Sequence, residues 1–273
     1  LKDEYIIEAT DYYIKFLLKN VKEYDDITGD SIDLYAYPLD YEHSLEAYEY
    51  YENLLEKDSC KWFYAAVPVD YDYKKHEYEI IEELFIPANY SKTNARIKID
   101  QVFLDELEEE ALIISGYEKE VYESRTSEKI NQARKRYPSG RVQVFDTEHN
   151  RLVPLNGALV KTRRWFSTGY GYTDNLGNYR VNEDYKYNVN YSVYFVNTNK
   201  FRIYNSLIDI DPAYHNVGSH SNSGHNIDIG RTSVAWRFAT THNATVKYYD
   251  FCNLYNITNP PANLKIAASN SNP

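Results

Sequence analysis

Apolar and polar positions alternate over short runs in the first part of the chain, which is the pattern of half-buried β-strands. The runs with this pattern are residues 10–17, 31–37, 61–69 and 77–86. Residues 19–27 are short, charged and predicted to be helical, and apolar residues recur at helical spacing from 101 to 114. We therefore predict a small α+β domain over residues 1–116.

A different pattern, rich in turns, begins at residue 138 and predicts a small antiparallel β-sandwich. Between residues 140 and 181, two apolar runs flank a Pro-Leu-x-Gly-Ala corner and a Gly-Tyr-Thr-Asp-x-x-Gly-x-Tyr turn. Asn and Gly in that turn supply the positive φ that tight turns require. Strands with turns every 8–12 residues or so fit a sandwich of about seven strands. We assign residues 138–200 to this sandwich and residues 117–137 to a charged linker or exposed helix.

The last third of the chain predicts one long helix and one strand. Apolar positions recur every three or four residues over 233–252, after a hydroxyl N-cap candidate at Thr232. Residues 264–268 predict a buried strand. Residues 205–230 are rich in Asn, Ser, Gly and His without periodicity, and predict a long loop. We expect residues 201–273 to form a separate, incomplete domain, so that the fold class is α+β with several domains.

The charge of the chain changes sign where the sandwich begins. The formal net charge is −11; residues 1–137 hold 32 acidic and 17 basic residues, whereas residues 138–273 hold 9 and 13. A nucleic-acid surface needs clustered Lys and Arg, so this balance argues against a nucleic-acid partner. No apolar run reaches the ~18 residues of a membrane span, and we expect no transmembrane segment.

Three motifs of the predicted sandwich resemble a known family. They are G-x-V-x-V-x-D-T from Gly140, P-L-x-G-A-x-V from Pro154 and G-Y-T-D-x-x-G-x-Y from Gly171. Together they resemble the carboxypeptidase regulatory-like domains, whose fold is a transthyretin-like (prealbumin-like) antiparallel sandwich. The resemblance implies that the third motif is a hairpin that follows the strand carrying Trp165 and Phe166.

The order of segments along the whole chain is similar to that of a group of Bacteroidetes surface lipoproteins. The segments are D-Y-Y-I-K-F-L, Y-P-L-D-Y-E, E-E-L-F-I-P, the sandwich and W-R-F-A-T-T-H-N-A. Some members of that group continue into a zincin-type metallopeptidase domain with an H-E-L-x-H segment. The resemblance implies an extracytoplasmic protein, periplasmic or anchored to the outer membrane, with a lipid anchor upstream of residue 1. It also implies a protein or glycan partner at the cell surface, and zinc in the full-length protein.

The sandwich region also supplies the candidate binding residues. Tyrosine is frequent, with 30 residues in 273, and suits half-exposed strands as well as ligand surfaces. A cluster of basic and aromatic side chains around residue 165 can bind an anion or stack on a sugar, or can simply cover one face of the sandwich. The candidate binding residues are Trp165, Tyr170, Tyr172, Arg163 and Arg164.

Histidines supply the candidate metal ligands. His215, His220 and His225 lie in the predicted loop, but a flexible loop does not fix the tetrahedral arrangement that zinc requires. His242 lies in the apolar stripe of the predicted helix, where we expect a hydrogen-bonded core histidine. The two cysteines, Cys60 and Cys252, allow one long-range disulfide and cannot build a Cys-based zinc site.

No catalytic residue is assigned, because H-E-x-x-H, G-x-S-x-G, P-loop and G-x-G-x-x-G motifs are absent from the sequence. Asp209, Asp211 and Asp228 could serve acid–base work or bind Ca²⁺, but Asp-x-Asp spacing is common in loops. The predicted function is a non-catalytic secreted or surface-anchored protein whose sandwich is a recognition or spacer module, without a cofactor in this chain. The alternatives are the N-terminal portion of a zinc-dependent metallopeptidase and a glycan-binding surface lipoprotein.

Overall fold

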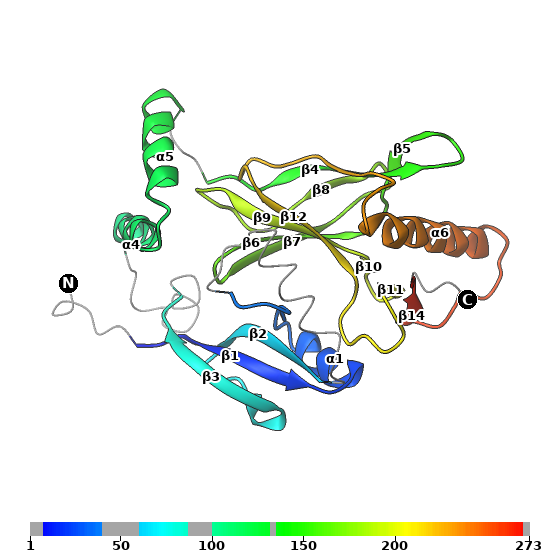
Figure 1. Ribbon diagram of the computed structural model, residues 1–273, viewed down its shortest axis with the longest axis horizontal. Helices are drawn as coiled ribbons and strands as arrows, with labels where there is room; N and C mark the ends of the chain where they lie inside the picture. Colours follow the sequence, from blue (N-terminus) through cyan, green and yellow to red (C-terminus); the bar gives the residue numbers. More distant parts are fainter. Residues whose placement is uncertain (1–7, 40–59, 87–99, 132–134, 270–273) are drawn as a thin grey trace. The chain divides into compact units, whose positions relative to one another are not determined.

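The computed structural model describes residues 8–39, 60–86, 100–131 and 135–269 of the chain (Figure 1). These residues form two compact units, one up to residue 131 and the other from residue 135 onward. The division lies close to the change in charge at residues 137 and 138. Each unit has its own sheets, so the mixed α+β content expected from the sequence is present, with most of the regular structure in strands.

A three-stranded antiparallel sheet forms the first unit, in the order β2-β1-β3. Its strands are β1 (Asp11–Leu18), β2 (Lys61–Pro68) and β3 (Glu77–Leu84). Helix α1 (Val21–Gly29) packs on the sheet, where the rings of Tyr24 and Phe63 meet at 5.3 Å between centroids and Ile27 is fully buried. Asn20 begins α1, because its side chain accepts a hydrogen bond from the Glu23 backbone N–H. The predicted strands at 10–17, 61–69 and 77–86 and the predicted helix at 19–27 are thereby confirmed.

The strand predicted over residues 31–37 is wrong. This segment forms one isolated bridge, between Tyr35 and Tyr64, and no regular ladder. Its alternating pattern has another cause: Leu34, Tyr35 and Tyr37 are buried in the core of the unit, although the backbone pairs with β2 at a single position. Alternating burial therefore does not require a sheet.

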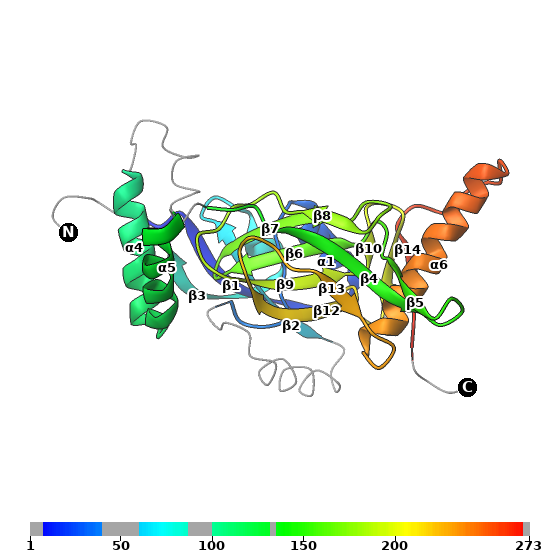
Figure 2. The ribbon, with the colours of Figure 1, turned by 90° about the horizontal axis from the view of Figure 1, so that it is seen from above.

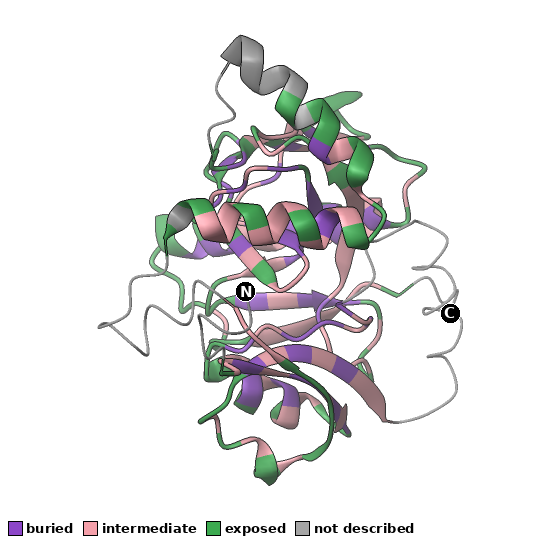
Figure 3. Cartoon of the chain, turned by 90° about the vertical axis from the view of Figure 1, so that its left-hand side faces the viewer, coloured by how far each residue is buried: buried purple, intermediate pink, exposed green. Residues whose placement is uncertain are grey.

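Two helices complete the first unit, α4 (Gln101–Ile114) and α5 (Glu118–Asn131). The helix predicted over 101–114 is confirmed, and the charged segment 117–137 contains a helix rather than only a linker. Arg125 pairs with Glu109 at 2.7 Å between the two helices. Most of their described surface is exposed or half-buried, as Figure 3 shows.

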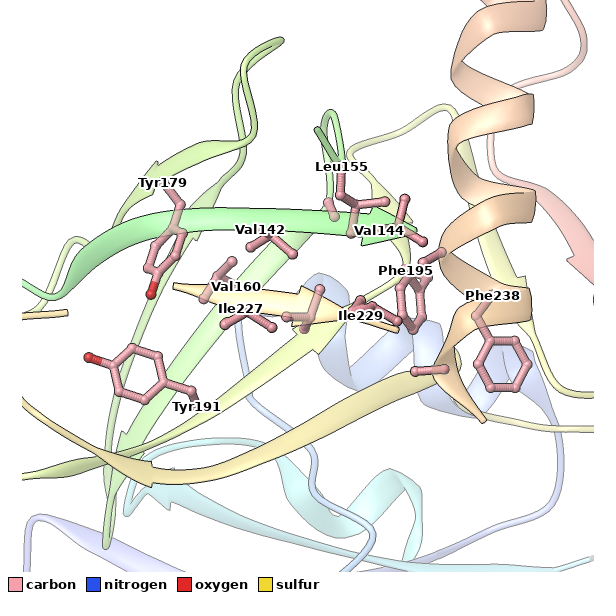
Figure 4. Packing of buried hydrophobic residues seen from close by; sticks show 14 of the residues in the cluster. Val142, Val144, Leu155, Val160, Tyr179, Tyr191, Phe195, Ile227, Ile229 and Phe238 are labelled. Atoms are coloured by element: carbon pink, nitrogen blue, oxygen red, sulfur yellow. The ribbon is translucent and has the colours of Figure 1, made fainter. Parts of the chain in front are cut away.

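The second unit is a β-sandwich of two sheets. One sheet has the order β12-β9-β6-β7 and the other the order β13-β4-β5, with β8 paired to the start of β4. The strands are β4 (Ser139–Asp146), β5 (Arg151–Pro154), β6 (Leu159–Arg164), β7 (Ser167–Tyr172), β8 (Asn178–Arg180), β9 (Val189–Tyr194), β12 (Tyr214–His220) and β13 (Ile227–Ile229). Val142, Val144, Val160 and Ile227 from both sheets meet in the core (Figure 4).

The long loop predicted over residues 205–230 is wrong, because it contains β12 and β13. Strand β12 pairs with β9, and β13 pairs with β4, so this segment completes the sandwich instead of leaving it. A β-bulge between Asn216 and Gly218 and two histidines on the strand interrupt the alternation by which strands are recognised. The β13–β4 pairing is parallel, so the sandwich is not purely antiparallel as expected.

The remaining elements form a small sheet under one long helix. The sheet has the order β10-β11-β14, from β10 (Val196–Asn197), β11 (Phe201–Tyr204) and β14 (Leu264–Ala267), and the helix is α6 (Ala235–Leu254). The predicted helix and terminal strand are confirmed within two or three residues. Strand β14 lies parallel to β11, with Phe201 opposite Leu264. Residues 201–273 were expected to form a separate domain, whereas the structure joins their described part to the sandwich.

Candidate functional site

The candidate site is the hairpin of β6 and β7, which begins with an unusual turn. Arg164 pairs with Ser167, so Trp165 and Phe166 alone form the turn, and the expectation that a strand carries these two residues is wrong. Trp165 has a φ of +46°, the left-handed conformation that costs a bulky residue about 1 kcal/mol or more. The Arg163 guanidinium donates a hydrogen bond to the Trp165 carbonyl at 2.7 Å and holds this conformation. The Arg164 guanidinium lies 5.5 Å from the centroid of the Trp165 ring.

The glycines and the tyrosines of strand β7 face opposite sides of the sheet. Gly169 and Gly171 face the sandwich interior, and a side chain at Gly171 would collide with the carbonyl of Arg180. The segment around residue 182 therefore lies directly against β7, and the Tyr170 N–H donates to the Asn182 side chain at 2.8 Å. Tyr170 and Tyr172 point to the opposite side, about 7 Å apart along the strand. They are 47% and 44% exposed.

The two tyrosines belong to a longer polar and aromatic row across the sheet. Cross-strand pairing places Lys161 beside Tyr170, and Lys161 also lies over the Tyr194 ring at 5.1 Å. Tyr194 stacks on Tyr214 at 5.0 Å between ring centroids. Burial raises the pKa of Tyr172, and the hydrogen bond between its phenol and the Thr198 side chain opposes that shift.

The predicted binding residues are not gathered in one pocket. Trp165 lies in the turn, and Tyr170 lies three residues further along β7 than Ser167, a distance of about 10 Å. Arg163 and Arg164 are 3% and 6% exposed, so the structure buries both guanidinium-bearing side chains. The side chains presented to solvent are therefore those of Tyr170 and Tyr172.

Two of the three candidate metal ligands come together, in a stack. The rings of His220 and His225 lie 3.6 Å apart with an angle of 7° between their planes, and the Tyr191 ring lies 6.1 Å from each. Stacked rings direct their nitrogen lone pairs along parallel planes, which do not converge on one ion as zinc ligands do. Burial lowers the pKa of His225, the neighbouring His220 lowers it further, and Asp228 opposes the shift. His215 does not join the stack, and burial lowers its pKa.

A cluster that the sequence analysis missed lies in the β4–β5 hairpin. The side chains of Asp146, Glu148 and His149 form the one group among the described residues whose ligand atoms approach closely enough for a metal ion, within 4.8 Å. The Asp146 carboxylate accepts the backbone N–H groups of Glu148 and His149 at 2.9 and 3.0 Å. The His149 bond is the main cause of the lowered pKa of Asp146. These bonds account for the cluster as the cap of a turn.

His242 is the hydrogen-bonded core histidine that we expected. It is fully buried on α6, with Nε2 2.9 Å from the Asn156 carbonyl oxygen and its ring 4.9 Å from the Phe201 ring. Burial lowers its pKa to about 4, although the hydrogen bond to Asn156 opposes that shift. Of the two cysteines, which the sequence allows to pair, Cys60 and Cys252 are both free thiols in the structure.

A polar cleft of about 720 Å³ lies between α1 and the segment that connects β2 to β3 in the first unit. Its lining contains side chains of both charges, and Lys19 pairs with Glu77 at 3.3 Å. The Tyr71 hydroxyl donates to Asp30 at 3.2 Å, and burial together with that carboxylate raises the pKa of Tyr71 to about 12. Because opposite charges in this cleft pair with one another, it does not single out one class of ligand.

Comparison of the chain with protein-family models, with curated proteins and with solved structures gives no match. The resemblance to carboxypeptidase regulatory-like domains therefore stays a prediction. Of the helices in the described ranges, none is long and apolar enough to cross a membrane, in agreement with the expectation from hydropathy.

Proposed function

We propose that this is a non-catalytic surface recognition protein whose sandwich unit binds glycans through Tyr170 and Tyr172. The observation that carries the proposal is the pair of half-exposed tyrosines on one side of β7. An aromatic ring packs against the C–H face of a sugar ring, and its phenol hydroxyl bonds to sugar hydroxyls. Two rings about 7 Å apart can engage successive parts of one chain.

The surroundings of the two rings support a polar ligand. Lys161 is the cross-strand neighbour of Tyr170 and adds a positive charge beside the rings. The part of the chain that forms this unit holds more basic than acidic residues, 13 against 9 from residue 138 onward. Neutral or acidic glycans are therefore favoured over basic partners.

The backbone beneath the rings supports a preformed surface. Asn182 exchanges hydrogen bonds with the Tyr170 backbone: its side chain accepts at 2.8 Å and its own N–H donates to the Tyr170 carbonyl at 3.1 Å. The interior glycines allow this close contact. A strand fixed in this way loses little conformational entropy when a ligand binds.

The test is a glycan array followed by titration calorimetry with the best ligand. Two ring contacts of about 0.5–1.5 kcal/mol each predict that the double variant Tyr170→Ala/Tyr172→Ala binds roughly fivefold to 150-fold more weakly. Tyr122→Ala is the matched control, because Tyr122 is 66% exposed on α5 of the other unit. Equal affinity of the wild type and the double variant would contradict the proposal, and so would a wild-type protein that binds no glycan.

The variant Trp165→Ala tests whether Trp165 contacts the glycan or only shapes the hairpin. If Trp165 only shapes the hairpin, its removal changes affinity less than the double tyrosine variant does.

The metallopeptidase alternative rests on the resemblance alone, and the chain contains no H-E-x-x-H sequence.

A further inference from the structure

Strand β3 forms an open edge of the sheet in the first unit. Strand β1 lies between β3 and β2 (Figure 1; Figure 2), and among the described residues β3 pairs with β1 and with no other strand. Every residue of β3 except Leu84 is exposed. In an antiparallel pair, the backbone N–H and C=O groups of alternate residues point away from the partner strand. These groups on the outer side of β3 can therefore bond to a further strand.

One face of β3 carries apolar side chains at the margin of the unit's core. Tyr78 lies opposite Phe16 of β1, and Phe16 is fully buried. Ile80 lies opposite Ile14, which is also fully buried. Tyr78 and Ile80 themselves remain 37% and 39% exposed. Because cross-strand neighbours share a face of the sheet, apolar residues on an adjacent strand would cover these two side chains and extend the core.

The other face of β3 carries carboxylates that pair with lysines. Lys15 Nζ lies 2.8 Å from Oε2 of Glu79, and Lys19 Nζ lies 3.3 Å from Oε2 of Glu77. The two glutamate side chains are still 60% and 56% exposed, and a carboxylate accepts hydrogen bonds on both of its oxygens. Charge therefore changes from basic on the β1 side to acidic on β3. A further strand continues this alternation if it carries lysine or arginine beside the glutamates.

The same carboxylates oppose two other occupants of the edge. A second copy of β3 would place glutamate opposite glutamate, and like charges directly across a ladder destabilise it. An acidic segment of another protein would meet the same repulsion. The surrounding charge acts in the same direction, because residues 1–137 hold 32 acidic and 17 basic residues. Charge complementarity therefore favours a basic segment.

We infer that β3 is a docking edge for an extended segment of a partner protein in which lysine or arginine alternates with apolar residues, and that this segment joins the sheet as a fourth strand. Backbone hydrogen bonds give such a complex affinity, and the alternate side chains give it specificity. A β-bulge at Ile81 limits the regular edge to the residues from Glu77 to Ile80. The contact is therefore small, and small contacts associate weakly, in the micromolar range. The edge lies in the first unit and excludes the tyrosines of β7, so it stands or falls independently of glycan binding.

The first test measures binding of labelled, capped peptides to the full chain by fluorescence anisotropy. The peptides have the length of β3, eight residues, and the salt concentration is about 50 mM, where charges are little screened. The probe peptide alternates lysine and valine, and it is expected to bind with micromolar affinity. A peptide of the same composition, with its lysines and valines in separate blocks, should bind about tenfold more weakly or less, because it cannot match both faces of β3. A peptide that alternates glutamate and valine should not bind.

The second test exchanges the charge of the edge. Glu77→Lys/Glu79→Lys is expected to bind the lysine–valine peptide roughly tenfold more weakly or less, because attractive cross-strand pairs become repulsive. The same variant should gain binding of the glutamate–valine peptide. A misfolded variant would not gain a ligand, so this exchange distinguishes a changed site from a lost fold. Glu106→Lys/Glu110→Lys is the matched control, because it makes the same change of charge at exposed positions of α4 and should keep the wild-type preference.

The third test examines the backbone pairing itself. A strand that pairs on one side directs the N–H groups of alternate residues toward its partner. N-methylation of one alternate set of residues in the lysine–valine peptide is therefore expected to abolish binding, whereas N-methylation of the other set should leave most of it.

Four results would overturn the inference. They are no binding of the lysine–valine peptide, equal binding of the alternating and the block peptide, equal behaviour of the β3 and α4 variants, and full binding by both N-methylated peptides. The inference is also overturned if the wild-type chain self-associates in sedimentation equilibrium and Ile80→Asp abolishes that association, because the edge then belongs to a second copy.

Discussion

The two units both contain strands with alternating side chains, but they bury these strands to very different extents. In the sandwich unit every residue of β9 is buried, and the core joins residues from two facing sheets and α6. In the first unit every residue of β3 except Leu84 is exposed, and one helix packs on a sheet of three strands. The facing sheet accounts for the burial of the inner residues of β9, Val189, Tyr191 and Val193, whereas an edge strand without a facing layer buries little. Two alternating patterns of equal clarity can therefore contribute very different stabilities.

The edge strand β3 shows how an exposed strand avoids association. Its sequence carries four glutamates, Glu77, Glu79, Glu82 and Glu83, beside three half-exposed apolar residues. Charge on an edge strand prevents edge-to-edge pairing with strands of like charge. The charged edge therefore opposes association between copies of the chain, although the strand buries little apolar surface.

The largest expected effect is the difference in unfolding free energy lost when a buried side chain is shortened in the sandwich core and when an exposed one is shortened in β3. Phe195 is fully buried between the sandwich and α6, and Phe195→Ala is expected to lower the free energy of unfolding of that unit by about 3–5 kcal/mol. Ile80→Ala in β3, where the side chain is 39% exposed, should cost less than about 1 kcal/mol. Urea denaturation checks both, with fluorescence of Trp62 for the first unit and of Trp236 for the second. Equal losses would contradict the contrast drawn here.

Acid should destabilise the sandwich unit through His242. Its pKa is about 4 in the folded protein and about 6.5 in the unfolded chain, so the folded state favours the neutral ring. The stability that this gives is complete above pH 6.5 and is lost as pH falls from 6.5 toward 4, by up to about 3 kcal/mol. The unfolding free energy of His242→Gln should change less with pH over that window than the unfolding free energy of the wild type. If the two pH profiles run parallel, burial of His242 is not the cause.

A smaller effect is expected from the close contact behind β7. Gly171→Ala places a methyl group against the Arg180 carbonyl and should lower the free energy of unfolding by about 1–3 kcal/mol. Gly230→Ala is the control, because no atom lies within 4 Å of the added carbon and φ there is not positive. Thermal unfolding should leave that control within about 0.5 kcal/mol of the wild type.

The smallest effect should come from the ion pair on the first unit's sheet. Lys15 and Glu79 lie 2.8 Å apart across β1 and β3, and Glu79→Gln should cost about 1 kcal/mol or less because the Glu79 side chain is 60% exposed. High salt should remove most of the difference between the variant and the wild type. A difference that persists in 1 M NaCl would show that packing, not charge, holds this strand.

Local patterns predicted most of the elements because α4, α6 and most strands have periodic side chains. The helix at 101–114 and the strands around Val142, Val160 and Tyr191 follow from periodicity and turn residues alone. Strands β12 and β13 could not be predicted, because a bulge breaks the first and the second is only three residues long. Their existence depends on pairing with β9 and β4, which the sequence does not display.

The candidate site was predicted in part for the same reason. Exposure of Tyr170 and Tyr172 follows from alternation with Gly169 and Gly171 on one strand. Burial of Arg163 and Arg164 does not, since charged residues in an alternating run are expected to face water. The stack of His220 on His225 depends on the crossing from one sheet to the other and could not be inferred from their spacing.

The parallel pairing of β13 with β4 also determines when the sandwich can fold. Val142 pairs with Ile227, which is synthesised 85 residues later, and β9 pairs with β12, which also follows it in the chain. A chain emerging from the ribosome therefore has β4 and β9 with open edges until residues 214–229 have been synthesised. The same holds for a fragment cut at residue 200, the end of the sandwich predicted from sequence. Such a fragment would expose two strand edges and is expected to aggregate, whereas one that extends to residue 269 has its last strands in place.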